Sequence, residues 1–344
     1  MAIEIRATGS AVPSRRLTNV DLATEVDTDD EWIRSHTGIG SRHIADDNTG
    51  CSDLALDASR AVLTAALKQE DCREKTLEEI ALTLDMIILA TATADYYGCP
   101  STACIIQHKL GARNAGAVDI SAGCSGFIYG LEMAAGLLGL NTSRKRILVI
   151  GAEVLSRFID WNDRGTCILF GDGAGAVLLE KTGNPSTGSG KRGILRTILK
   201  ADGAGADYLI IKKGGSRNKF KAGEIIKTPP HIEMNGRAVY NFAVKAITGI
   251  ITNLLKEESL TIDEVRWIVP HQANARIVSA AAKRLGIPED KFFLNIEEYA
   301  NTSSASIPIA LDELNRNGKL SRGDLIMTVG FGAGLTYGGN LIIY

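Results

Sequence analysis

The sequence has almost no net charge and few of the features that mark a special class of protein. Its 38 Lys and Arg and 40 Asp and Glu give −2 at pH 7 over 344 residues. This balance gives no general reason to expect a nucleic acid or an anionic membrane as a partner. Residues 1–6 form a strand-like start without a long apolar stretch, so we expect no secretory signal and a cytoplasmic protein.

The six cysteines show neither a CxxC pair nor a regular spacing. They are Cys51, Cys72, Cys99, Cys104, Cys124 and Cys167. A disulfide framework or a zinc site needs paired or regularly spaced cysteines, so we expect reduced thiols and no metal. Hydrophobic residues make up 45% of the chain and charged residues 23%. This composition provides a hydrophobic core for one large or two medium domains.

Residues 117–127, Ala-Val-Asp-Ile-Ser-Ala-Gly-Cys-Ser-Gly-Phe, predict a buried strand, a tight turn and a helix that begins at Cys124. The helix, about residues 124–140, is apolar on nearly every face, and Glu132 is its only charge. Such a helix has to be buried, and we do not expect it to span a membrane, because it is short for that, rich in glycine and carries a carboxylate. Close approach of other backbones is favoured by its glycines, Gly126, Gly130, Gly136 and Gly139.

A position at the start of a buried helix would change the chemistry of the Cys124 thiol. Helix N-termini carry unpaired N–H groups and positive potential. In a partly buried site this is worth about 2 kcal/mol, or roughly 1.5 pKa units, which would bring a thiol pKa of about 8.5 near neutrality. A nearby imidazolium would lower the pKa further. The position predicts a nucleophile, with a small buried cysteine used for packing as the alternative.

The second half of the chain repeats the pattern of the first at an offset of roughly 175 to 181 residues. The expected strands at 86–93 and 147–154 match those at 267–270 and 325–330. The strand that leads into Cys124 matches 292–295, which leads into Asn301-Thr302-Ser303-Ser304. We expect an α/β protein of two duplicated β/α halves, 1–182 and 183–344, joined by the Gly-, Ser- and Pro-rich residues 183–193.

Two polar residues of the second half stand where they can face Cys124. His271 follows an apolar strand in Pro-His-Gln-Ala-Asn, and Asn301 opens Asn-Thr-Ser-Ser. Alone, a histidine after a strand is usually structural and an asparagine before Thr-Ser-Ser is most simply a helix cap. If the halves are related by a pseudo-twofold, the two residues and Cys124 form a constellation for nucleophilic catalysis.

Several motifs, in order along nearly the whole chain, resemble those of β-ketoacyl-acyl-carrier-protein synthase III. The resemblance implies the thiolase fold with αβαβα layers, a homodimer, and the condensation that starts type II fatty-acid synthesis. In that reaction an acyl-CoA, here expected to be acetyl-CoA, and malonyl-acyl-carrier protein give β-ketoacyl-carrier protein, CO2 and CoA. The motifs are Thr37-Gly38-Ile39, residues 119–127, Asp163-Arg164-Gly165-Thr166, residues 170–176, Pro270-His271-Gln272-Ala273-Asn274, Asn301-Thr302-Ser303 and Phe331-Gly332-Ala333-Gly334.

The resemblance also implies catalytic roles. The Cys124 thiolate would take the acyl group, with the developing oxyanion held by the backbone N–H groups of Cys124 and Ala333, each worth about 3 kcal/mol. His271 Nε2–H and Asn301 Nδ2–H would hold the enolate that forms when malonyl thioester loses CO2. Because the leaving carboxylate supplies the electrons, we expect no cofactor and treat the CoA thioester as a substrate.

The CoA site implied by the resemblance has two parts. Trp32 and Arg164 match residues that sandwich the adenine, a use to which both are suited; ordinary packing and a surface ion pair are the alternatives. His36 stands where the family often has arginine, which weakens an expected phosphate contact. Thr28 also forms a predicted capping box with Glu31. The pantetheine positions are Thr28, Gly236, Ala273, Asn274 and Phe331.

Two further surfaces are implied. Arg276, Lys283 and Arg284 are basic and helically spaced, as an acidic carrier protein would require, and a solvated helix face is the alternative.

Cys99 stands where the family often has a bulky aromatic that borders the partner subunit's acyl pocket. A smaller residue there would deepen that pocket, unless Tyr96 and Tyr97 refill it, so the preferred acyl chain length stays open.

Other readings of the same residues remain. A degradative thiolase would need a second cysteine in residues 330–334, which contain none, and elongation enzymes use histidine where this chain has Asn301. A polyketide-type condensing enzyme with the same triad stays open, as do the physiological pathway and its feedback control. Gly123-Cys124-Ser125-Gly126 also fits the nucleophile elbow of an α/β hydrolase, which leaves the duplication unexplained. A non-enzymatic scaffold would show no selective alkylation of Cys124.

Overall fold

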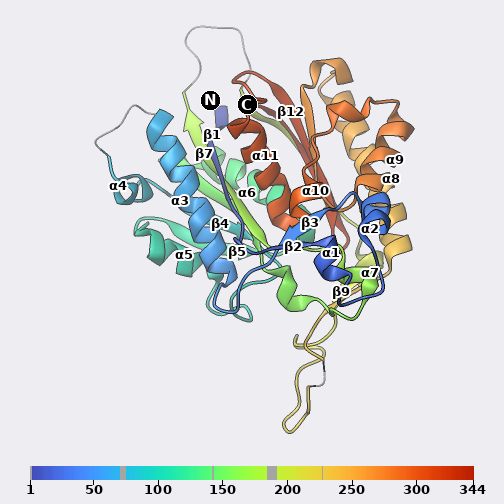
Figure 1. Cartoon of the computed structure of the whole chain (residues 1–344). Coiled ribbons are helices and arrows are strands. Elements are labelled where there is room, and N and C mark those ends of the chain that lie inside the picture. The colour runs from blue at the N-terminus through green and yellow to red at the C-terminus, as the bar shows by residue number, and fades with distance from the viewer. Residues whose placement is uncertain (1, 70–74, 142, 184–191, 227) are drawn as a thin grey trace.

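Two β-sheets lie side by side with helices between them and on both outer faces, as the computed structural model shows (Figure 1). The structure describes residues 2–69, 75–141, 143–183, 192–226 and 228–344. Cys72 and most of the expected linker, residues 184–191, lie outside the described residues. The layered α/β thiolase-like fold predicted from the sequence is confirmed.

The first sheet has five strands, all from the first half of the chain. β4 is parallel to β5 and β6, and β7 is antiparallel to β6 and β1. Their order is β1 (Ala2–Ala11), β7 (Gly173–Thr182), β6 (Arg146–Glu153), β4 (Met86–Ala90) and β5 (Gly116–Ile120).

The second sheet repeats this arrangement with strands of the second half. β12 is parallel to β11 and antiparallel to β13, which is antiparallel to β8. Where the first sheet has β5, the second has only a bridge between Ile268 and Phe292, so the strand expected at 292–295 is wrong. The order is β8 (Gly193–Ala201), β13 (Thr336–Ile343), β12 (Leu325–Gly332) and β11 (Trp267–Pro270).

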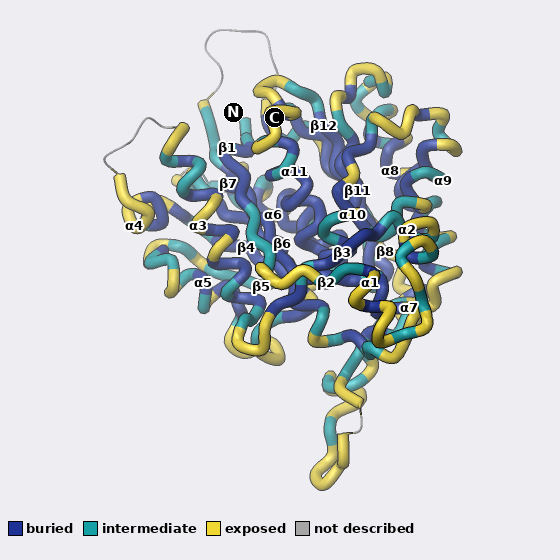
Figure 2. Tube along the Cα trace, viewed as in Figure 1, coloured by how far each residue is buried: buried dark blue, intermediate teal, exposed yellow. Residues whose placement is uncertain are grey.

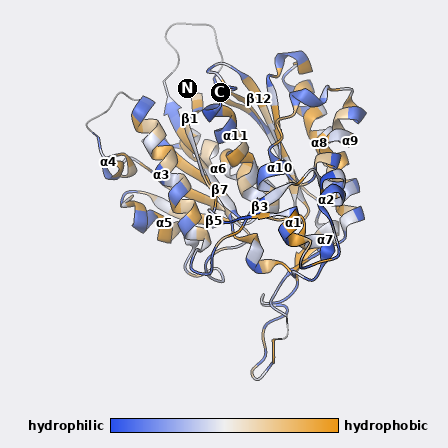
Figure 3. Ribbon diagram, viewed as in Figure 1, coloured by the Kyte–Doolittle hydropathy of each residue, from blue (hydrophilic) through white to orange (hydrophobic). Residues whose placement is uncertain are grey.

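Side-chain alternation along the strands places each sheet between two apolar layers. In β6, Leu148, Ile150 and Ala152 join the core under the outer helices, whereas Ile147 and Val149 join the central core. Successive side chains of a strand point to opposite faces, so an unbroken apolar run is buried on both. Figure 2 shows the strands as the most buried part of the molecule, and Figure 3 shows the apolar colouring along them.

The helices complete the five layers. α3 (Cys51–Gln69) and α5 (Thr102–Leu110) cover the outer face of the first sheet, and α8 (Gly236–Glu257) and α9 (Ala275–Leu285) cover that of the second. α6 (Gly126–Leu140) and α11 (Ser306–Arg316) share the central core, as the duplication predicts. Because this core contains residues of both halves, the boundary near residue 182 stays a prediction.

Two helices are long and apolar enough to cross a membrane by length and composition, Gly123–Leu140 and Gly236–Glu257. Their apolar faces pack in the central and outer cores. Burial of the first is incomplete, because Met133 and Leu140 are exposed. Gly126 and Gly130 lie against Ala90 and Val149, as expected for close approach, whereas no atom lies near Gly136 or Gly139.

Short strands, short helices and 3-10 turns connect the long elements. Between β9 and β10 the chain extends away from the body as an arm (Figure 1). The short strands are β2 (Arg16–Thr18), β3 (Ser41–His43), β9 (Leu209–Ile211) and β10 (Ile232–Met234); the short helices are α1 (Asn19–Leu22), α2 (Asp30–Thr37), α4 (Leu77–Ala81), α7 (Arg164–Cys167) and α10 (Ile296–Tyr299); the 3-10 turns are η1 (Gly123–Ser125), η2 (Leu155–Phe158), η3 (Gly203–Tyr208), η4 (Ile262–Glu264), η5 (Glu289–Lys291) and η6 (Ser303–Ala305).

Candidate active site

A cavity of about 140 Å³ opens where the two central helices begin, and Cys124, His271 and Asn301 all line it. The three residues come from the turn before α6, the end of β11 and the turn before α11. Their convergence agrees with the pseudo-twofold argument. The other lining residues are Leu169, Phe170, Leu209, Met234, Gly236, Val239, Tyr240, Ala273, Asn274, Ile277, Phe331 and Gly332.

Cys124 lies in the 3-10 turn η1, and the α-helix begins two residues later at Gly126. The expected helix start at Cys124 is therefore displaced. Gly123 adopts φ +51°, and a Cβ there would lie 2.7 Å from the backbone nitrogen of Ala333. Only glycine accommodates that backbone and that approach. The turn after β12 thus lies directly against the backbone of Cys124, where the expected oxyanion donors Cys124 and Ala333 would have to meet.

Burial raises the pKa of the Cys124 thiol to about 12, and the negative charge of Glu153 acts in the same direction. The near-neutral thiol expected from the helix position is therefore wrong. Desolvation of the thiolate outweighs the turn's dipole because the side chain is removed from water. The sulfur is a protonated thiol at rest, and attack on a thioester needs a route for its proton.

His271 is held in place by its backbone and by one nitrogen of its ring. Its backbone N–H donates to Val329 O at 2.8 Å, and Nδ1 lies 2.8 Å from Ser306 Oγ. The Ser306 hydroxyl has two acceptors at equal distance, His271 Nδ1 and Ser303 O, which lies 2.8 Å from Oγ and also accepts the backbone N–H of Ser306. Donation of the hydroxyl proton to Nδ1 is the arrangement that puts the ring proton on Nε2, as the expected enolate role requires. Burial lowers the pKa of His271 to about 3, so the ring is neutral, as the expected enolate role requires, and it provides no imidazolium that would lower the pKa of Cys124.

The two polar atoms of the Asn301 side chain have different surroundings: Oδ1 is bonded within the protein, and Nδ2 is left for a ligand. Oδ1 accepts the backbone N–H of Ser303 at 2.8 Å, as the helix-cap interpretation expects. Backbone bonds to Leu169 O and from Gly171 N fix its main chain at the cavity wall. With Oδ1 occupied, Nδ2 is the side-chain atom left to donate to a ligand.

Glu153 is a residue of this region that the sequence reasoning did not single out. It ends β6, is fully buried, and accepts hydrogen bonds from both halves of the molecule. Its signal in the sequence is a single carboxylate in the otherwise apolar run 147–154.

The expected pantetheine residues divide into two groups. Gly236, Ala273, Asn274 and Phe331 line the cavity with the three catalytic candidates, and Thr28 does not. Thr28 Oγ1 is buried and has no hydrogen-bond partner among the described atoms. The predicted Thr28 capping box is wrong, because α2 begins one residue later, with Asp29 accepting from Trp32 N at 2.7 Å.

Trp32 and Arg164 face each other near the cavity. The Arg164 guanidinium lies 4.8 Å from the Trp32 ring centroid, and His36 stacks on the same indole at 4.3 Å. Asn274 Nδ2 donates to His36 O at 3.0 Å, which ties this aromatic group to the cavity wall. At 4.8 Å the guanidinium contacts the indole directly, so a flat heteroaromatic ring could lie between them only after the Arg164 side chain moves away.

The three basic residues expected to meet a carrier protein lie exposed on α9. Arg276 and Lys283 are seven residues apart, and Arg284 follows, so all three lie toward one side of the helix. Their helix begins directly after Ala273 and Asn274 of the cavity wall, so Arg276 in its first turn is nearer to the cavity than Lys283 and Arg284 in its last turn.

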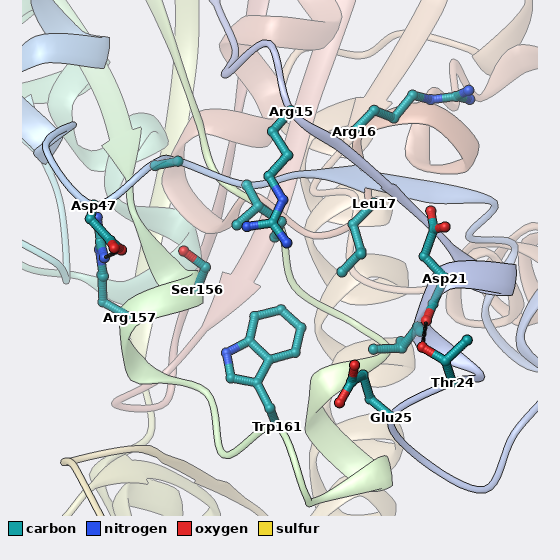
Figure 4. A pocket seen from close by; sticks show the side chains of 13 residues that line it. Arg15, Arg16, Leu17, Asp21, Thr24, Glu25, Asp47, Ser156, Arg157 and Trp161 are labelled. Carbon is teal, nitrogen blue, oxygen red and sulfur yellow. Dashed lines mark hydrogen bonds and ion pairs between the residues drawn. The ribbon is translucent and has the colours of Figure 1, made fainter.

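A larger hollow than this cavity lies elsewhere on the described surface (Figure 4). It measures about 700 Å³ and contains none of the three catalytic candidates. Two of the three arginines that line it form ion pairs with acidic groups: Arg157 pairs with Asp47 at 3.0 Å, and Arg16 pairs with Glu298 at 2.5 Å. Size alone therefore does not identify the reactive site. Among the described residues no cluster of His, Cys, Asp and Glu suits a metal ion.

Comparisons with known proteins agree with this site. Residues 118–203 match the family "3-Oxoacyl-[acyl-carrier-protein (ACP)] synthase III", and residues 255–344 match its C-terminal family. The chain is 48% identical to a beta-ketoacyl-[acyl-carrier-protein] synthase III of Caldanaerobacter subterraneus over 99% of this chain and 98% of the relative. It is 44% identical to the enzyme of that name from Clostridium acetobutylicum, over 98% and 97% of the two chains.

Solved structures give the same result. The 3-oxoacyl-[acyl-carrier-protein] synthase III of Aquifex aeolicus superposes with a TM-score of 0.85 at 40% identity, over 100% of both chains. The priming β-ketosynthase of the R1128 polyketide pathway superposes at 0.86 with 31% identity, over 99% of this chain and 96% of that one. The chain belongs to the 3-oxoacyl-[acyl-carrier-protein] synthase III family, as its sequence motifs predict.

Proposed function

We propose that this acyltransferase condenses a short-chain acyl-CoA, acetyl-CoA in the first instance, with malonyl-acyl-carrier protein and releases CO2 and CoA. The observation that supports this most is the meeting of a cysteine, a neutral histidine and an asparagine amide in one buried cavity. The relatives of matching length have the same name, which specifies an acyl-carrier-protein synthase.

The first half-reaction is transfer of the acyl group to Cys124. The thiol sulfur attacks the thioester carbonyl, and the oxyanion accepts hydrogen bonds from the backbone N–H groups of Cys124 and Ala333. One such donor is worth about 3 kcal/mol of barrier. The tight packing of the Gly123 and Ala333 turns holds those donors in place before the substrate arrives.

The second half-reaction is decarboxylation of the malonyl thioester. Loss of CO2 leaves an enolate, whose oxygen accepts hydrogen bonds from His271 Nε2–H and Asn301 Nδ2–H. A neutral imidazole suits this role, since it stabilises the enolate oxygen without giving up its proton. The carbanion then attacks the acyl group on Cys124, and the electrons come from the departing carboxylate without a metal or organic cofactor.

The CoA thioester would enter past the aromatic group formed by Trp32, His36 and Arg164. An adenine ring would insert between the indole and the guanidinium, displacing contacts that the two side chains make with each other and with Asp27 O. Pantetheine would then run along the wall of Asn274 and Phe331 to the sulfur. The buried hydroxyl of Thr28, which has no hydrogen-bond partner among the described residues, would bind the polar part of this arm.

Malonyl-acyl-carrier protein would dock on the basic face of α9. Arg276, Lys283 and Arg284 are exposed on the helix that follows the cavity wall, and an acidic carrier would be steered toward them. The same opening would thus admit the phosphopantetheine arm of the carrier after CoA has left.

A second copy of the chain would cover the free edge of β5. Apart from Asp119 this edge strand is apolar, but Val118 and Ile120 are only half-buried, and among the described strands β4 alone pairs with it. Tyr96 and Tyr97 are 58% and 77% exposed in the loop that also contains Cys99. Natural proteins rarely leave such an edge open, and antiparallel pairing about a twofold axis would close it. We expect the homodimer to work in the cytoplasm.

A polyketide-type primer reaction is the second candidate, favoured by the similarity to the R1128 priming β-ketosynthase. The two functions share a mechanism and differ in the acyl starter. The α/β-hydrolase alternative does not fit the duplicated fold.

Product analysis tests the proposal. The protein is incubated with acetyl-CoA or a longer acyl-CoA and then with malonyl-acyl-carrier protein, and the carrier is analysed by mass spectrometry. We expect β-ketoacyl-carrier protein and CO2, most rapidly from the preferred starter. Release of free acid without a ketoacyl thioester would contradict the proposal.

A further inference from the structure

The turn that carries Asn301 into the cavity has a backbone conformation that few residues other than glycine adopt. Ala300, directly before Asn301, has φ +55° and ψ −155°, and Ser303 has φ +50°. The first combination lies close to a region that is essentially confined to glycine, and the second is the left-handed region. Both conformations cost free energy and persist only where the surrounding structure holds them. Residues 300–304 therefore need contacts that keep the turn in this shape.

Ser303 connects the two residues that are expected to hold the enolate. Its backbone N–H donates to Asn301 Oδ1 at 2.8 Å. Its carbonyl oxygen accepts the backbone N–H of Ser306 and lies 2.8 Å from Ser306 Oγ, which in turn lies 2.8 Å from His271 Nδ1. A rotation of the backbone at Ser303 would therefore move the hydrogen-bond partners of both Asn301 and His271.

Glu153, the last residue of β6, holds the side chain of Ser303. It is fully buried, and its Oε1 accepts the Ser303 hydroxyl at 3.0 Å. Ser304 Oγ lies 2.9 Å from the same oxygen and 2.8 Å from Ala90 O. The turn also packs on β6 itself, because a Cβ at Gly151 would lie only 2.2 Å from Ser304 O. These contacts attach the turn of the second half to the sheet of the first half.

The other side of the Glu153 carboxyl group is bonded to the residues that follow β4. Oε2 accepts from Thr93 Oγ1 at 2.7 Å, from Ala92 N at 3.1 Å and from Thr91 Oγ1 at 3.3 Å. A buried polar group with all its partners in place is rigid, because leaving any of them unpaired in the interior is costly. Glu153 is therefore a fixed point from which the turn at 300–304 can be held.

We propose that Glu153 is a positioning residue for the enolate site, which holds Ser303 and through it keeps Asn301 and His271 aimed at the substrate. Glu153 does not line the described cavity, so it acts through the turn and not by touching the substrate. The role requires only that the carboxyl group accept hydrogen bonds at this place. The inference deepens the proposed condensation and rests on it, because the enolate forms only in that reaction.

Glu153→Gln tests the proposal, because its amide has one acceptor oxygen and presents an NH2 group to donors on the other side. The kcat for decarboxylation of malonyl-acyl-carrier protein should fall at least tenfold, since small displacements of positioned groups have large effects on rate. The KM for the carrier should change less than threefold. Acylation of Cys124 by acetyl-CoA should also fall less than threefold, because that step does not use the enolate donors. Labelled CO2 and mass spectrometry of the Cys124 peptide measure the two steps.

A second variant and a control separate positioning from general stability. Ser303→Ala removes the hydroxyl bond and leaves the carboxyl group, so it should impair decarboxylation selectively as well, and it carries the test if Glu153→Gln does not fold. Asp312→Asn is the matched control, because Asp312 is a buried carboxyl group whose described hydrogen bonds go to Thr8, Ser10 and Arg316. It should lower the melting temperature and leave the kcat for decarboxylation within twofold.

Ala300→Gly distinguishes an effect through the turn from a direct effect of the carboxyl group. Glycine adopts the backbone conformation of Ala300 at no steric cost, so the turn should depend less on Glu153. In this background Glu153→Gln should lower the kcat less than threefold, a clear departure from additivity.

Three results would overturn the assignment: normal decarboxylation by Glu153→Gln, equal losses in acylation and decarboxylation, or the same loss with and without Ala300→Gly. No CO2 release from the unmodified protein would overturn the proposed condensation and this assignment together, so the two failures are distinguishable.

Discussion

His271 and Asn301 each have one polar atom committed to the protein and one left for substrate. Nδ1 of the histidine is held by Ser306, and Oδ1 of the asparagine by Ser303 N. Both residues reach the cavity with their remaining nitrogen as the donor. Their expected work is therefore in holding the enolate, which appears only after the malonyl thioester is bound.

Alanine at His271 or Asn301 should slow decarboxylation of malonyl-acyl-carrier protein about 100-fold or more, because one enolate donor is lost. Acylation of Cys124 by acyl-CoA should fall much less. Because burial lowers the pKa of His271 to about 3, decarboxylation should show no titration of this ring between pH 5 and pH 8. The measurement is release of labelled CO2 against pH. Normal CO2 release by either variant would remove that residue from the enolate site.

The residue types of the site could be predicted from the sequence, but their electrostatics could not. A cysteine at a turn, a histidine after a strand and an asparagine before Thr-Ser-Ser are visible as motifs. The pKa of Cys124 depends on desolvation and on Glu153, which no local pattern reveals. The helix cap predicted at Thr28 is wrong for a simpler reason: the adjacent Asp29 is an equally good N-cap residue, and α2 uses it.

At the scale of elements, the turns η1 and β12–β13 are packed backbone against backbone. A Cβ at Gly332 would meet the backbone nitrogen of Cys124, and one at Gly123 would meet that of Ala333. Backbone atoms cannot move aside as a flexible side chain can. The oxyanion site therefore depends on residues that have no side chain.

Gly332→Ala should lower the free energy of unfolding by about 1–3 kcal/mol through overpacking and reduce acyl transfer far more than stability. Gly136→Ala is the matched control, because no atom lies within 4 Å of its Cβ position in the middle of α6. The control should gain about 0.5–1 kcal/mol from the loss of glycine in a helix. Thermal melting and acylation rates report both effects, and equal activity of the two variants would contradict the close approach.

The basic face of α9 yields a prediction about the carrier protein. Arg276→Glu should raise the KM for malonyl-acyl-carrier protein about tenfold, equivalent to roughly 1.4 kcal/mol of binding, while the KM for acyl-CoA changes little. Arg60→Glu reverses a charge on an exposed side chain of α3, on the opposite outer layer, and serves as the control. An unchanged KM for the carrier in Arg276→Glu would remove this residue from the docking surface.

For the whole molecule, duplication explains both the fold and the place of the site. The repeat was visible because strands buried on two faces are continuous apolar runs, as in β4, β6, β11 and β12. The repeat is imperfect where residues 292–295 make only a bridge, because a periodic apolar pattern does not specify hydrogen-bonded partners. Contacts between distant turns, such as Gly332 with Cys124, had no signal in either half alone.

The free edge of β5 predicts the oligomeric state. The protein should have a solution mass twice that of the 36.7 kDa chain, because a second copy would pair with this strand and cover Tyr96 and Tyr97. Tyr97→Ala removes a side chain that is 77% exposed in the single chain, so it should weaken the dimer without lowering the stability of the monomer. Light scattering over a range of concentrations measures both, and a monomer at high concentration would contradict the predicted pairing.

The account depends most on Cys124 as the site of the acyl group. The protein is mixed with acetyl-CoA, digested, and every cysteine peptide is weighed by mass spectrometry, beside Cys124→Ala treated identically. The account predicts one acetyl group, on the Cys124 peptide, which malonyl-acyl-carrier protein then removes as a ketoacyl product, and no acetyl group on the variant. An acetyl group on another residue, or its loss as free acetate when malonyl-acyl-carrier protein is added, would contradict it.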